Sequence, residues 1–449
     1  MMPGRYQAYP EYKDSGVEWL ESLPSHWNSS KIKYIAPFQV GWTPPTKIDT
    51  NFEGDNLWAN ISDLKGRYIE NTAKKISDAA AEAAPMDITP KGSLLYSFKL
   101  SVGAVSFANH DMYTNEAIAS FLEGGELPLA YLYYVLPKFV IENASTNIYG
   151  ARILNQELIK SAFLLAPPYE EADKIASFLN HETTKIDTLI KKQQQLIKLL
   201  KEKRQAVISH AVTKGLNPDV PMKDSGAEWL ESLPRHWNSS KIKYIAPFQV
   251  GWTPPTKIDA NFEGDNLWAN ISDLKGRYIE NTAKKISDAA AKAASMDITP
   301  KGSLLYSFKL SVGAVSFANQ DMYTNEAIAS FLEGDGLPLA YLYYALPKFV
   351  IENASTNIYG ARILNQELIK SAFLLAPPYE EAGKIASFLD HETTKIDTLI
   401  EKANKFITIT KERRAALISA AVTGKIDVRN WQAPVTSNNQ KEINKEVVT

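Results

Sequence analysis

The residues of this sequence with the clearest capacity for chemistry are polar and aromatic side chains in turn-rich, non-periodic segments. Asparagine can form two hydrogen bonds with adenine, arginine two with guanine, and threonine or serine one with either base. Taken singly, each is an ordinary polar loop residue. The whole set occurs twice, however, and it predicts a surface that binds nucleic acid. The candidate residues are Trp42, Thr43, Thr46, Lys47, Lys99, Ser101, Tyr113, Asn115, Asn147, Tyr149 and Arg152, and again Trp252, Thr253, Thr256, Lys257, Lys309, Ser311, Tyr323, Asn325, Asn357, Tyr359 and Arg362.

One short motif suggests catalysis. Ala166-Pro167-Pro168-Tyr169 and its copy Ala376-Pro377-Pro378-Tyr379 resemble the Asp/Asn-Pro-Pro-Tyr site of amino-group DNA methyltransferases. In that site the first residue accepts hydrogen bonds from the amino group of a flipped base, which alanine cannot do. No glycine-rich loop for a methyl donor accompanies the motif, so we interpret the two prolines as the end of a strand.

Metal, nucleotide and thiol chemistry find little support. The six histidines are scattered, and His181-Glu182-Thr183-Thr184-Lys185 lacks the second histidine of a zinc protease. No GxxxxGK[ST] loop is present, and the chain contains no cysteine. We therefore expect no catalytic residue, no metal site and no bound cofactor.

The sequence is an internal duplication. Residues 13–190 align with residues 223–400 at a fixed offset of 210, without a gap and with eleven differences in 178 positions. Two modules with 167 identities must share one fold and nearly one surface. After Ile190 and Ile400 the copies diverge, and they converge again loosely at Ala211-Val212-Thr213 and Ala421-Val422-Thr423.

Two long helices are predicted at residues 170–213 and 380–423. In both, apolar residues recur in alternating steps of three and four, with no proline in either. The first stripe is Ile175, Leu179, Ile186, Leu189, Leu196/Ile197, Leu200, Val207 and Ala211; the second is Ile385, Leu389, Ile396, Leu399, Ala403, Phe406/Ile407, Leu417 and Ala421. Each helix would be roughly 65 Å long at ~1.5 Å per residue.

A helix of that length must cover its apolar stripe, and the other copy is its natural partner. We expect an intramolecular antiparallel coiled coil that holds the modules apart, with an approximate two-fold axis across its middle. The predicted organisation is a module at 1–169, a helix at 170–213, a module at 214–379, a helix at 380–423 and a tail at 424–449. The tail is expected to pack near the N-terminus and then to become disordered.

Composition fits a cytoplasmic globular protein. The chain is 45% hydrophobic and 22% charged, with a net charge of −2. No stretch approaches the ~20 apolar residues of a membrane span, and the N-terminus lacks the apolar core of a signal peptide. The segment from Lys185 to Arg204 contains seven basic and two acidic residues. Taken alone, this excess of basic residues is most simply explained as the solvent-exposed face of a helix.

Each module is predicted to be α+β, with a mixed or antiparallel sheet. We expect a short helix and a turn over residues 12–27, strands at 31–39, 57–61 and 159–165, and two strands within 93–107. Residues 116–122 are expected to form a strand or a short helix. The apolar run 129–139 is predicted to be helical as far as Pro137.

Several segments together match the sequence signature of one known family. The entry signature is Tyr12-Lys13-Asp14-Ser15-Gly16-Val17-Glu18-Trp19-Leu20 with Leu23-Pro24-Ser25-His26-Trp27. Further matches are Gly41-Trp42-Thr43-Pro44, Leu57-Trp58-Ala59-Asn60-Ile61-Ser62-Asp63-Leu64, Lys91-Gly92-Ser93, Asn115-Glu116-Ala117-Ile118, Pro167-Pro168-Tyr169-Glu170-Glu171 and Lys185-Ile186-Asp187-Thr188-Leu189-Ile190. The most specific is Leu417-Ile418-Ser419-Ala420-Ala421-Val422-Thr423-Gly424-Lys425-Ile426-Asp427-Val428-Arg429. With these segments the chain resembles the specificity subunits of type I restriction-modification systems. The departures are small: Trp42 where the family commonly has glycine, Ala166 and Tyr169 around the proline pair, and the order Lys214-Gly215.

The resemblance implies two target-recognition domains on antiparallel helices, no catalytic activity, and partners comprising double-stranded DNA, two methyltransferase subunits and restriction subunits. Those methyltransferase subunits transfer methyl from S-adenosylmethionine to adenine N6. Because the two modules are nearly identical, we expect the half-sites to be inverted copies, an interrupted palindrome. The alternatives are a self-sufficient DNA methyltransferase and a coiled-coil scaffold that does not bind DNA.

Overall fold

The computed structural model describes residues 6–17, 20–99, 101–146, 152–227, 230–294, 296–309, 311–356 and 362–433. It divides into two compact units. Unit 1 comprises Met1–Lys192 and Phe406–Thr449, and unit 2 comprises Gln193–Lys405. Each unit therefore contains one module, the first part of one long helix and the last part of the other.

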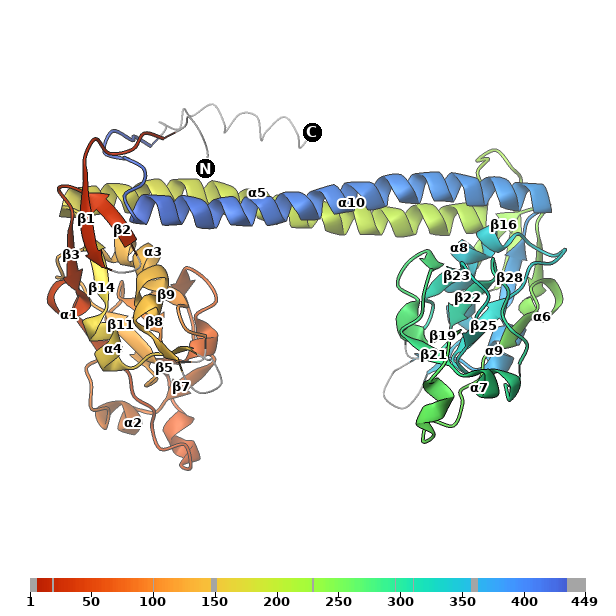
Figure 1. The fold of residues 1–449 in the computed structure, drawn as a ribbon, viewed down its shortest axis with the longest axis horizontal. Helices are drawn as coiled ribbons and strands as arrows, with labels where there is room; N and C mark the ends of the chain where they lie inside the picture. Colours follow the sequence, from red (N-terminus) through yellow and green to blue (C-terminus); the bar gives the residue numbers. More distant parts are fainter. Residues whose placement is uncertain are drawn as a thin grey trace. The chain divides into compact units, whose positions relative to one another are not determined.

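The two long helices are α5 (Tyr169–Lys214), of 46 residues, and α10 (Tyr379–Val422), of 44 residues. In unit 1 the Arg414 guanidinium lies 2.9 Å from the Asp187 carboxylate, and Lys174 Nζ donates to the carbonyl of Arg429 at 3.0 Å. Asp187, farther along α5, therefore contacts Arg414 within α10, whereas Lys174, nearer the start of α5, contacts Arg429 just past the end of α10. The two helices run in opposite directions (Figure 1). The expected antiparallel pairing is present in unit 1.

Unit 2 has the equivalent arrangement. Arg204 lies 2.9 Å from Asp397, and Gly215, just past the end of α5, approaches Glu381 near the start of α10. Arg204 and Asp397 each lie 210 residues from their counterparts in the Arg414–Asp187 pair. Both units thus use the same ion pair between the same helix positions, in antiparallel order.

The seam between the helices differs from the predicted stripe. Ile186, Ile396 and Ala403 are buried as expected, but the side chains of Leu189 and Leu399 are 45% and 50% exposed. Of the adjacent pair Phe406/Ile407, Ile407 is the buried member. On a straight α-helix, positions seven residues apart are offset by ~20° around the helix axis. A residue that continues a strict seven-residue repeat can therefore lie outside the contact between the helices.

Unit 1 is built from short strands and helices that precede α5. In chain order they are β1 (Tyr12–Val17), β2 (Leu20–Pro24), β3 (Asn28–Lys31), α1 (Ile32–Ile35), β4 (Phe38–Val40), η1 (Asp49–Phe52), β5 (Asn56–Ala59), η2 (Ile61–Asp63), β6 (Tyr68–Ile69), β7 (Lys74–Ile76), α2 (Asp78–Glu82), β8 (Leu94–Ser97), β9 (Val105–Ala108), β10 (Tyr113–Thr114), β11 (Ile118–Phe121), α3 (Leu129–Phe139), η3 (Val140–Asn143), β12 (Ser145–Thr146), β13 (Arg152–Ile153), α4 (Gln156–Ser161) and β14 (Phe163–Ala166).

Unit 2 repeats this order between α5 and α10. Its elements are β15 (Met222–Ala227), β16 (Leu230–Pro234), β17 (Asn238–Lys241), α6 (Ile242–Ile245), β18 (Phe248–Val250), η4 (Asp259–Phe262), β19 (Asn266–Ala269), η5 (Ile271–Asp273), β20 (Tyr278–Ile279), β21 (Lys284–Ile286), α7 (Asp288–Lys292), β22 (Leu304–Ser307), β23 (Val315–Ala318), β24 (Tyr323–Thr324), β25 (Ile328–Phe331), α8 (Leu339–Phe349), η6 (Val350–Asn353), β26 (Ser355–Thr356), β27 (Arg362–Ile363), α9 (Gln366–Ser371) and β28 (Phe373–Ala376).

Two sheets dominate each module. In unit 1 a five-stranded sheet has the order β4-β11-β8-β9-β6, and a three-stranded sheet has the order β10-β5-β7. The β6–β9 and β5–β10 pairs are parallel and the other pairs are antiparallel. The sheets are therefore mixed, as predicted, and α3 packs its buried Leu132 and Leu136 into the same core as Tyr96 of β8.

The module and the helix ends share one core. In unit 1 that core contains Ile175 and Leu179 from the start of α5 and Ala421 and Val422 from the end of α10. In unit 2 the corresponding cluster contains Ile208 and Val212 of α5 with Ile385 and Leu389 of α10. Because burial of apolar surface is the main stabilising term in folding, each module depends on the end of the other module's helix.

Several local predictions were wrong. Residues 12–17 and 20–24 form the paired antiparallel strands β1 and β2 rather than a helix, with Gly16 at φ 68°, a left-handed conformation that glycine adopts readily. Within residues 31–39, α1 interrupts the expected strand, and within 159–165, α4 precedes the short β14. The α3 helix continues two residues past Pro137, to Phe139. The strands near 57–61 and within 93–107 are confirmed.

In unit 1 the segment after α10 lies against the start of the chain. Tyr12 donates its hydroxyl to the carbonyl of Gly424 at 2.9 Å, and Asp427 N–H donates to the carbonyl of Gln7 at 2.7 Å. The Trp431 ring meets Phe178 edge-on at 5.5 Å. The predicted disorder of the tail concerns residues beyond 433, which lie outside the described part of the chain.

Buried tyrosines give the fold a dependence on alkaline pH. Burial raises the pKa of Tyr131 and of its counterpart Tyr341 well above the usual value, because the ionised form loses its hydration. In the unfolded chain these hydroxyls ionise near the ordinary tyrosine pKa of about 10. Their contribution to stability is complete below that pH and is lost as the pH rises above it. The melting temperature should therefore fall above about pH 10, and this fall should be smaller in a Tyr131→Phe, Tyr341→Phe variant.

Candidate nucleic-acid interface

Three of the candidate segments leave the five-stranded sheet of unit 1 at the same edge. Val40, the last residue of β4, pairs with Ala119, and Ser97, the last residue of β8, pairs with Ile118 at the start of β11. The chain enters β11 from Asn115 and Glu116, and it leaves β4 toward Trp42 and β8 toward Lys99. The residues at these strand ends, 41–43, 97–99, 101–103 and 115–117, are together called the loop edge.

The main chain of Trp42 is fixed from two sides. Its N–H donates to the carbonyl of Thr114 at 2.7 Å, and its carbonyl accepts from Trp58 Nε1 at 2.9 Å. Gly41 lies so close to the carbonyls of Thr114 and Asn115 that any Cβ would clash with them. The glycine therefore permits the approach that brings Trp42 beside β10.

Thr43 is bound by the carboxylate of Glu116, the residue that follows Asn115 in the chain. The hydroxyl of Thr43 donates to Oε2 of Glu116, an exposed residue that sequence reasoning did not select. Asn115 Oδ1 accepts the N–H of Ala117 at 3.1 Å, a bond that does not use the Nδ2 donors of this amide. Glu116 directly follows the candidate residue Asn115 in a segment that resembles the family, and this position is the sequence feature that could have identified it.

Lys99 and Ser101 occupy the turn between β8 and β9. Both are exposed, and the Lys99 ammonium lies 5.9 Å from the centre of the Phe98 ring. The turn is held by Ser97, whose hydroxyl donates to the carbonyl of Lys99 at 3.0 Å, and by Gly103 at φ 91°. Because the Lys99 side chain is not part of this framework, its charge is available at the surface.

The remaining candidates are not all gathered at the loop edge. Tyr113 lies on β10 of the three-stranded sheet and is half-buried against Trp58, and Thr46 and Lys47 are exposed in the loop that leads to η1. Arg152 is exposed on β13 and donates to the carbonyl of Ile141 at 3.4 Å. Asn147, Tyr149, Asn357 and Tyr359 lie outside the described residues.

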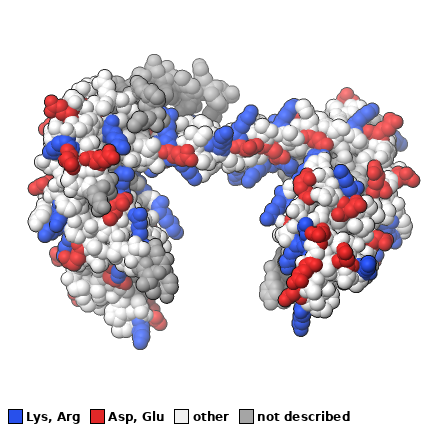
Figure 2. All heavy atoms as spheres, viewed as in Figure 1, with Lys and Arg blue, Asp and Glu red and all other residues white. Residues whose placement is uncertain are grey.

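Unit 2 carries the same arrangement. Trp252 N–H donates to Thr324 at 2.8 Å, Trp268 Nε1 donates to Trp252 at 2.9 Å, and Thr253 donates to Glu326. The other candidates in unit 2 also have the surroundings of their counterparts. Asn325 accepts from the N–H of Ala327, Arg362 donates to the carbonyl of Ile351, and Tyr323 packs against Trp268. Lys309 and Ser311 lie in the β22–β23 turn, and Thr256 and Lys257 are exposed before η4. On the face that Figure 2 shows, Lys and Arg are interspersed with Asp and Glu over each unit.

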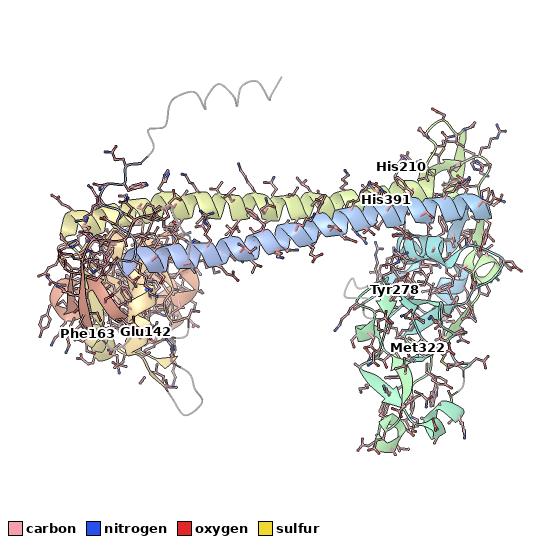
Figure 3. All side chains as sticks on the ribbon, turned by 45° about the horizontal axis from the view of Figure 1, so that its top comes forward. Glu142, Phe163, His210, Tyr278, Met322 and His391 are labelled. Carbon is pink, nitrogen blue, oxygen red and sulfur yellow. The ribbon has the colours of Figure 1, made fainter. Side chains whose placement is uncertain are left out.

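The histidines are dispersed among several elements. His26 bonds to Glu171 at 2.8 Å, and His110 lies 3.9 Å from Glu70 beyond the end of β9, at the opposite edge of the sheet from Lys99. His210 projects from α5 and His391 from α10 (Figure 3). Within the described residues, no three His, Asp or Glu side chains form a group that could hold a metal ion. No helix in that part of the chain has the length and apolar character to cross a membrane.

Comparisons with known proteins agree on one family. The model described as "Type I restriction modification DNA specificity domain" matches residues 24–199 and again 234–408. The chain is 23% identical to the type I restriction enzyme MjaIX specificity subunit of Methanocaldococcus jannaschii, over 94% of this chain and 98% of that protein. It is 21% identical to the EcoBI specificity subunit of Escherichia coli, over 68% and 66% of the two chains.

Solved structures share the fold at lower identity. A chain from a structure of a type I R-M system, solved for its complex assembly and conformational transition, has a TM-score of 0.72 at 15% identity and covers 90% of this chain and 99% of its own. The HsdS subunit of Thermoanaerobacter tengcongensis has a TM-score of 0.53 at 15% identity and covers 90% and 98%.

Proposed function

The chain belongs to the type I restriction modification DNA specificity family, and from this membership we propose how it recognises DNA and assembles with its partners. It is a specificity subunit with two target-recognition modules, one in each unit. Each module binds one half-site of a bipartite target. The observation that carries this proposal is the doubled loop edge, where two copies of the family domain present the same polar side chains.

The loop edge is the surface that contacts base pairs. The donor half of Asn115 pairs with an acceptor on a base, and the Glu116 carboxylate accepts from an exocyclic amino group. Lys99 contacts a guanine or a phosphate, and Arg152 and Lys47 add phosphate contacts that position the module. The same roles fall to Asn325, Glu326, Lys309, Arg362 and Lys257 in unit 2.

The two half-sites are inverted copies of one sequence. The modules share 167 of 178 aligned residues, and within each unit the helices run antiparallel through the same Arg–Asp pair. If each module contacts its half-site in the same way, two near-identical modules bind an inverted repeat as the two subunits of a symmetric dimer do. A fixed number of unread base pairs separates the half-sites.

Partner subunits dock along the long helices. Both helices expose large apolar side chains at equivalent positions, with lysine or arginine between them, although the copies diverge in sequence here. The apolar residues are Leu189, Leu196 and Leu199 on α5 and Leu399, Phe406 and Ile409 on α10. Exposed apolar residues spaced along one helix form a face suited to a partner helix. We assign this face to the methyltransferase subunits, with restriction subunits joining in the full complex.

The subunit itself is proposed to be non-catalytic and to act in the cytoplasm, where the DNA is. Ala166 and Ala376 have no side-chain acceptor for a base amino group, and methyl transfer to adenine N6 is left to the partners. A self-sufficient methyltransferase would bind labelled S-adenosylmethionine as an isolated chain, whereas a scaffold would not shift a specific duplex in a gel at any salt concentration.

The palindromic target has a direct test. Sequencing of modified bases in host DNA should return one interrupted palindrome, methylated on adenine in both strands and lost when the gene is deleted. As a control, exchanging the modules for each other should leave the motif unchanged. Two unlike half-sites would show that the near-identical modules read DNA differently and would contradict the proposal.

A further inference from the structure

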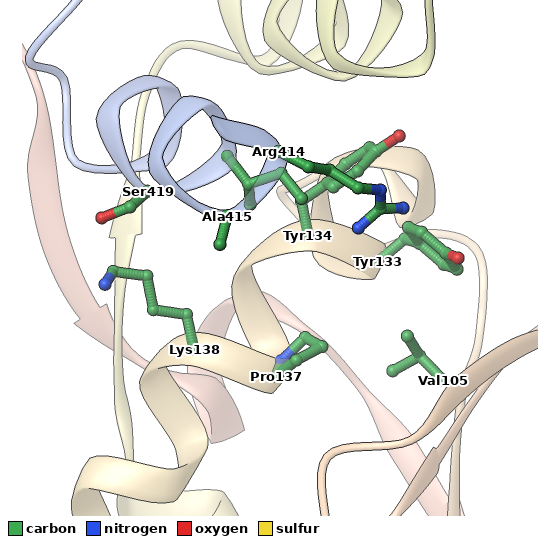
Figure 4. Close-up of a pocket in the computed structure, with 9 residues that line it drawn as sticks. Val105, Tyr133, Tyr134, Pro137, Lys138, Arg414, Ala415 and Ser419 are labelled. Carbon is green, nitrogen blue, oxygen red and sulfur yellow. The ribbon is translucent and has the colours of Figure 1, made fainter. Parts of the chain in front are cut away.

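In unit 1 the end of α10 lies over the module and leaves a crevice on each side of Tyr133. One crevice, of about 440 Å³, is lined by residues that include Lys65, Arg67, Tyr133, Thr184, Asp187 and Arg414. The other, of about 370 Å³, shares Val105, Tyr133 and Arg414 with the first and adds Lys138 (Figure 4). The Arg414 guanidinium lies beside the Tyr133 ring at the boundary between them (Figure 4).

The first crevice has an excess of positive charge. Its single carboxylate, Asp187, accepts from Nε and Nη2 of the Arg414 guanidinium, at 2.9 and 3.2 Å. The positive charges of Lys65 and Arg67 therefore have no carboxylate partner among the residues that line the crevice. Arg67 lies 4.9 Å from the centre of the Tyr133 ring, and its hydrogen-bond partners are two neutral hydroxyls, that of Tyr134 at 3.5 Å and that of Tyr68. Among the described residues it forms no ion pair, which makes it a half-buried cation without a counter-charge.

Unit 2 shows how this arginine behaves when a carboxylate is within reach. Its counterpart, Arg277, lies 2.7 Å from Asp390, and Tyr344 donates to the same carboxylate at 2.7 Å. The residue at the position of Asp390 in unit 1 is Asn180, which accepts the Tyr134 hydroxyl at 2.8 Å without contributing a charge. One of the eleven differences between the copies thus neutralises the arginine in unit 2 and leaves it unneutralised in unit 1.

We propose that the crevice at Arg67, Lys65 and Arg414 in unit 1 binds a phosphate group, and that its counterpart in unit 2 binds one more weakly because Asp390 already occupies the arginine. Arginine suits phosphate because its fixed fork of donors matches two oxygens. The hydroxyl of Thr184 adds a neutral donor at the wall. If the proposed DNA recognition holds, the natural source is the DNA backbone, and a phosphate-bearing small molecule is the other source of the same chemistry.

The two copies supply a matched pair of variants. Asn180→Asp places in unit 1 the residue that unit 2 has at the equivalent position, and Asp390→Asn places in unit 2 the residue of unit 1. Each substituted side chain is therefore one that the other copy of the module already accommodates. Calorimetric titration of the full chain with inorganic phosphate, at constant ionic strength, should show about tenfold weaker binding in Asn180→Asp, the effect of one nearby charge. Asp390→Asn should raise the phosphate affinity of the crevice at Arg277 in unit 2 to that of the crevice in unit 1.

Target-duplex binding across salt concentrations distinguishes the sources. If the DNA backbone fills the crevice, Asn180→Asp should lower the slope of log K against log salt by about one. Weaker phosphate binding with an unchanged DNA slope supports the same site with a small phosphate ligand. Unchanged phosphate titrations in both variants overturn the proposal, even where the duplex is still bound specifically. Failure of the unmodified chain to bind any duplex would instead count against the proposed function.

Discussion

Replacement of Lys99 and Lys309 together by alanine is expected to weaken binding of the target duplex by about a hundredfold, and either replacement alone by about tenfold. The reason is the duplicated loop edge. Each lysine is exposed in the β8–β9 or β22–β23 turn, and its ammonium is held only loosely over a phenylalanine ring, at 5.9 Å in both units. Contacts at two separate half-sites are independent, so their free energies add.

The replacement should leave the fold intact. The turn is held by the main-chain carbonyl of Lys99, which accepts from Ser97 at 3.0 Å, and alanine keeps that carbonyl. Lys91 and Lys301 serve as controls, because they are exposed lysines that lie before β8 and β22, at the other edge of the same sheets. Fluorescence anisotropy with the target duplex measures the effect. Equal losses in the Lys91→Ala, Lys301→Ala control would mean that the loop edge is not the reading surface.

Replacement of Glu171 by alanine is expected to destabilise unit 1 by about 3 kcal/mol, and the equivalent Glu381→Ala to destabilise unit 2 by about 1 kcal/mol. Glu171 is only 7% exposed and accepts from the Tyr9 hydroxyl at 2.6 Å, Trp27 Nε1 at 2.9 Å and His26 Nε2 at 2.8 Å. Its removal leaves three buried or half-buried polar groups without their acceptor.

Glu381 occupies the same place in unit 2 with weaker support. Its side chain is 30% exposed, and it accepts from Trp237 at 3.1 Å and His236 at 2.7 Å. Tyr9 lies before the duplicated segment, so unit 2 has no copy of it.

Native-state hydrogen exchange measures each unit separately, which a single melting curve of a two-unit chain cannot do. Faster exchange in residues 6–17 and 424–433 is the expected signature of Glu171→Ala, and Glu171→Gln should recover part of the loss. Equal destabilisation of both units by the two alanine variants would show that the Tyr9 contact contributes nothing.

The sequence alone determined the features that arise from repetition and periodicity. Two near-identical α+β modules and two long helices follow from the 210-residue offset and the apolar stripes, and the antiparallel order follows because each helix must cover its stripe. Family membership followed from contiguous motifs such as the run from Leu417 to Arg429. These inferences need only local pattern and chain length, which are explicit in a linear sequence.

Tertiary structure decided which side chains meet. Trp42, Lys99 and Asn115 share an edge because three non-consecutive strands pair there, and Glu116 joins them through Thr43. Leu189 faces solvent because helix geometry drifts from the strict heptad. The contrast between Arg67 and Arg277 depends on a residue more than one hundred positions away in each copy. Such contacts depend on strand register and on packing between distant segments, and neither is specified by residue type and spacing along the chain.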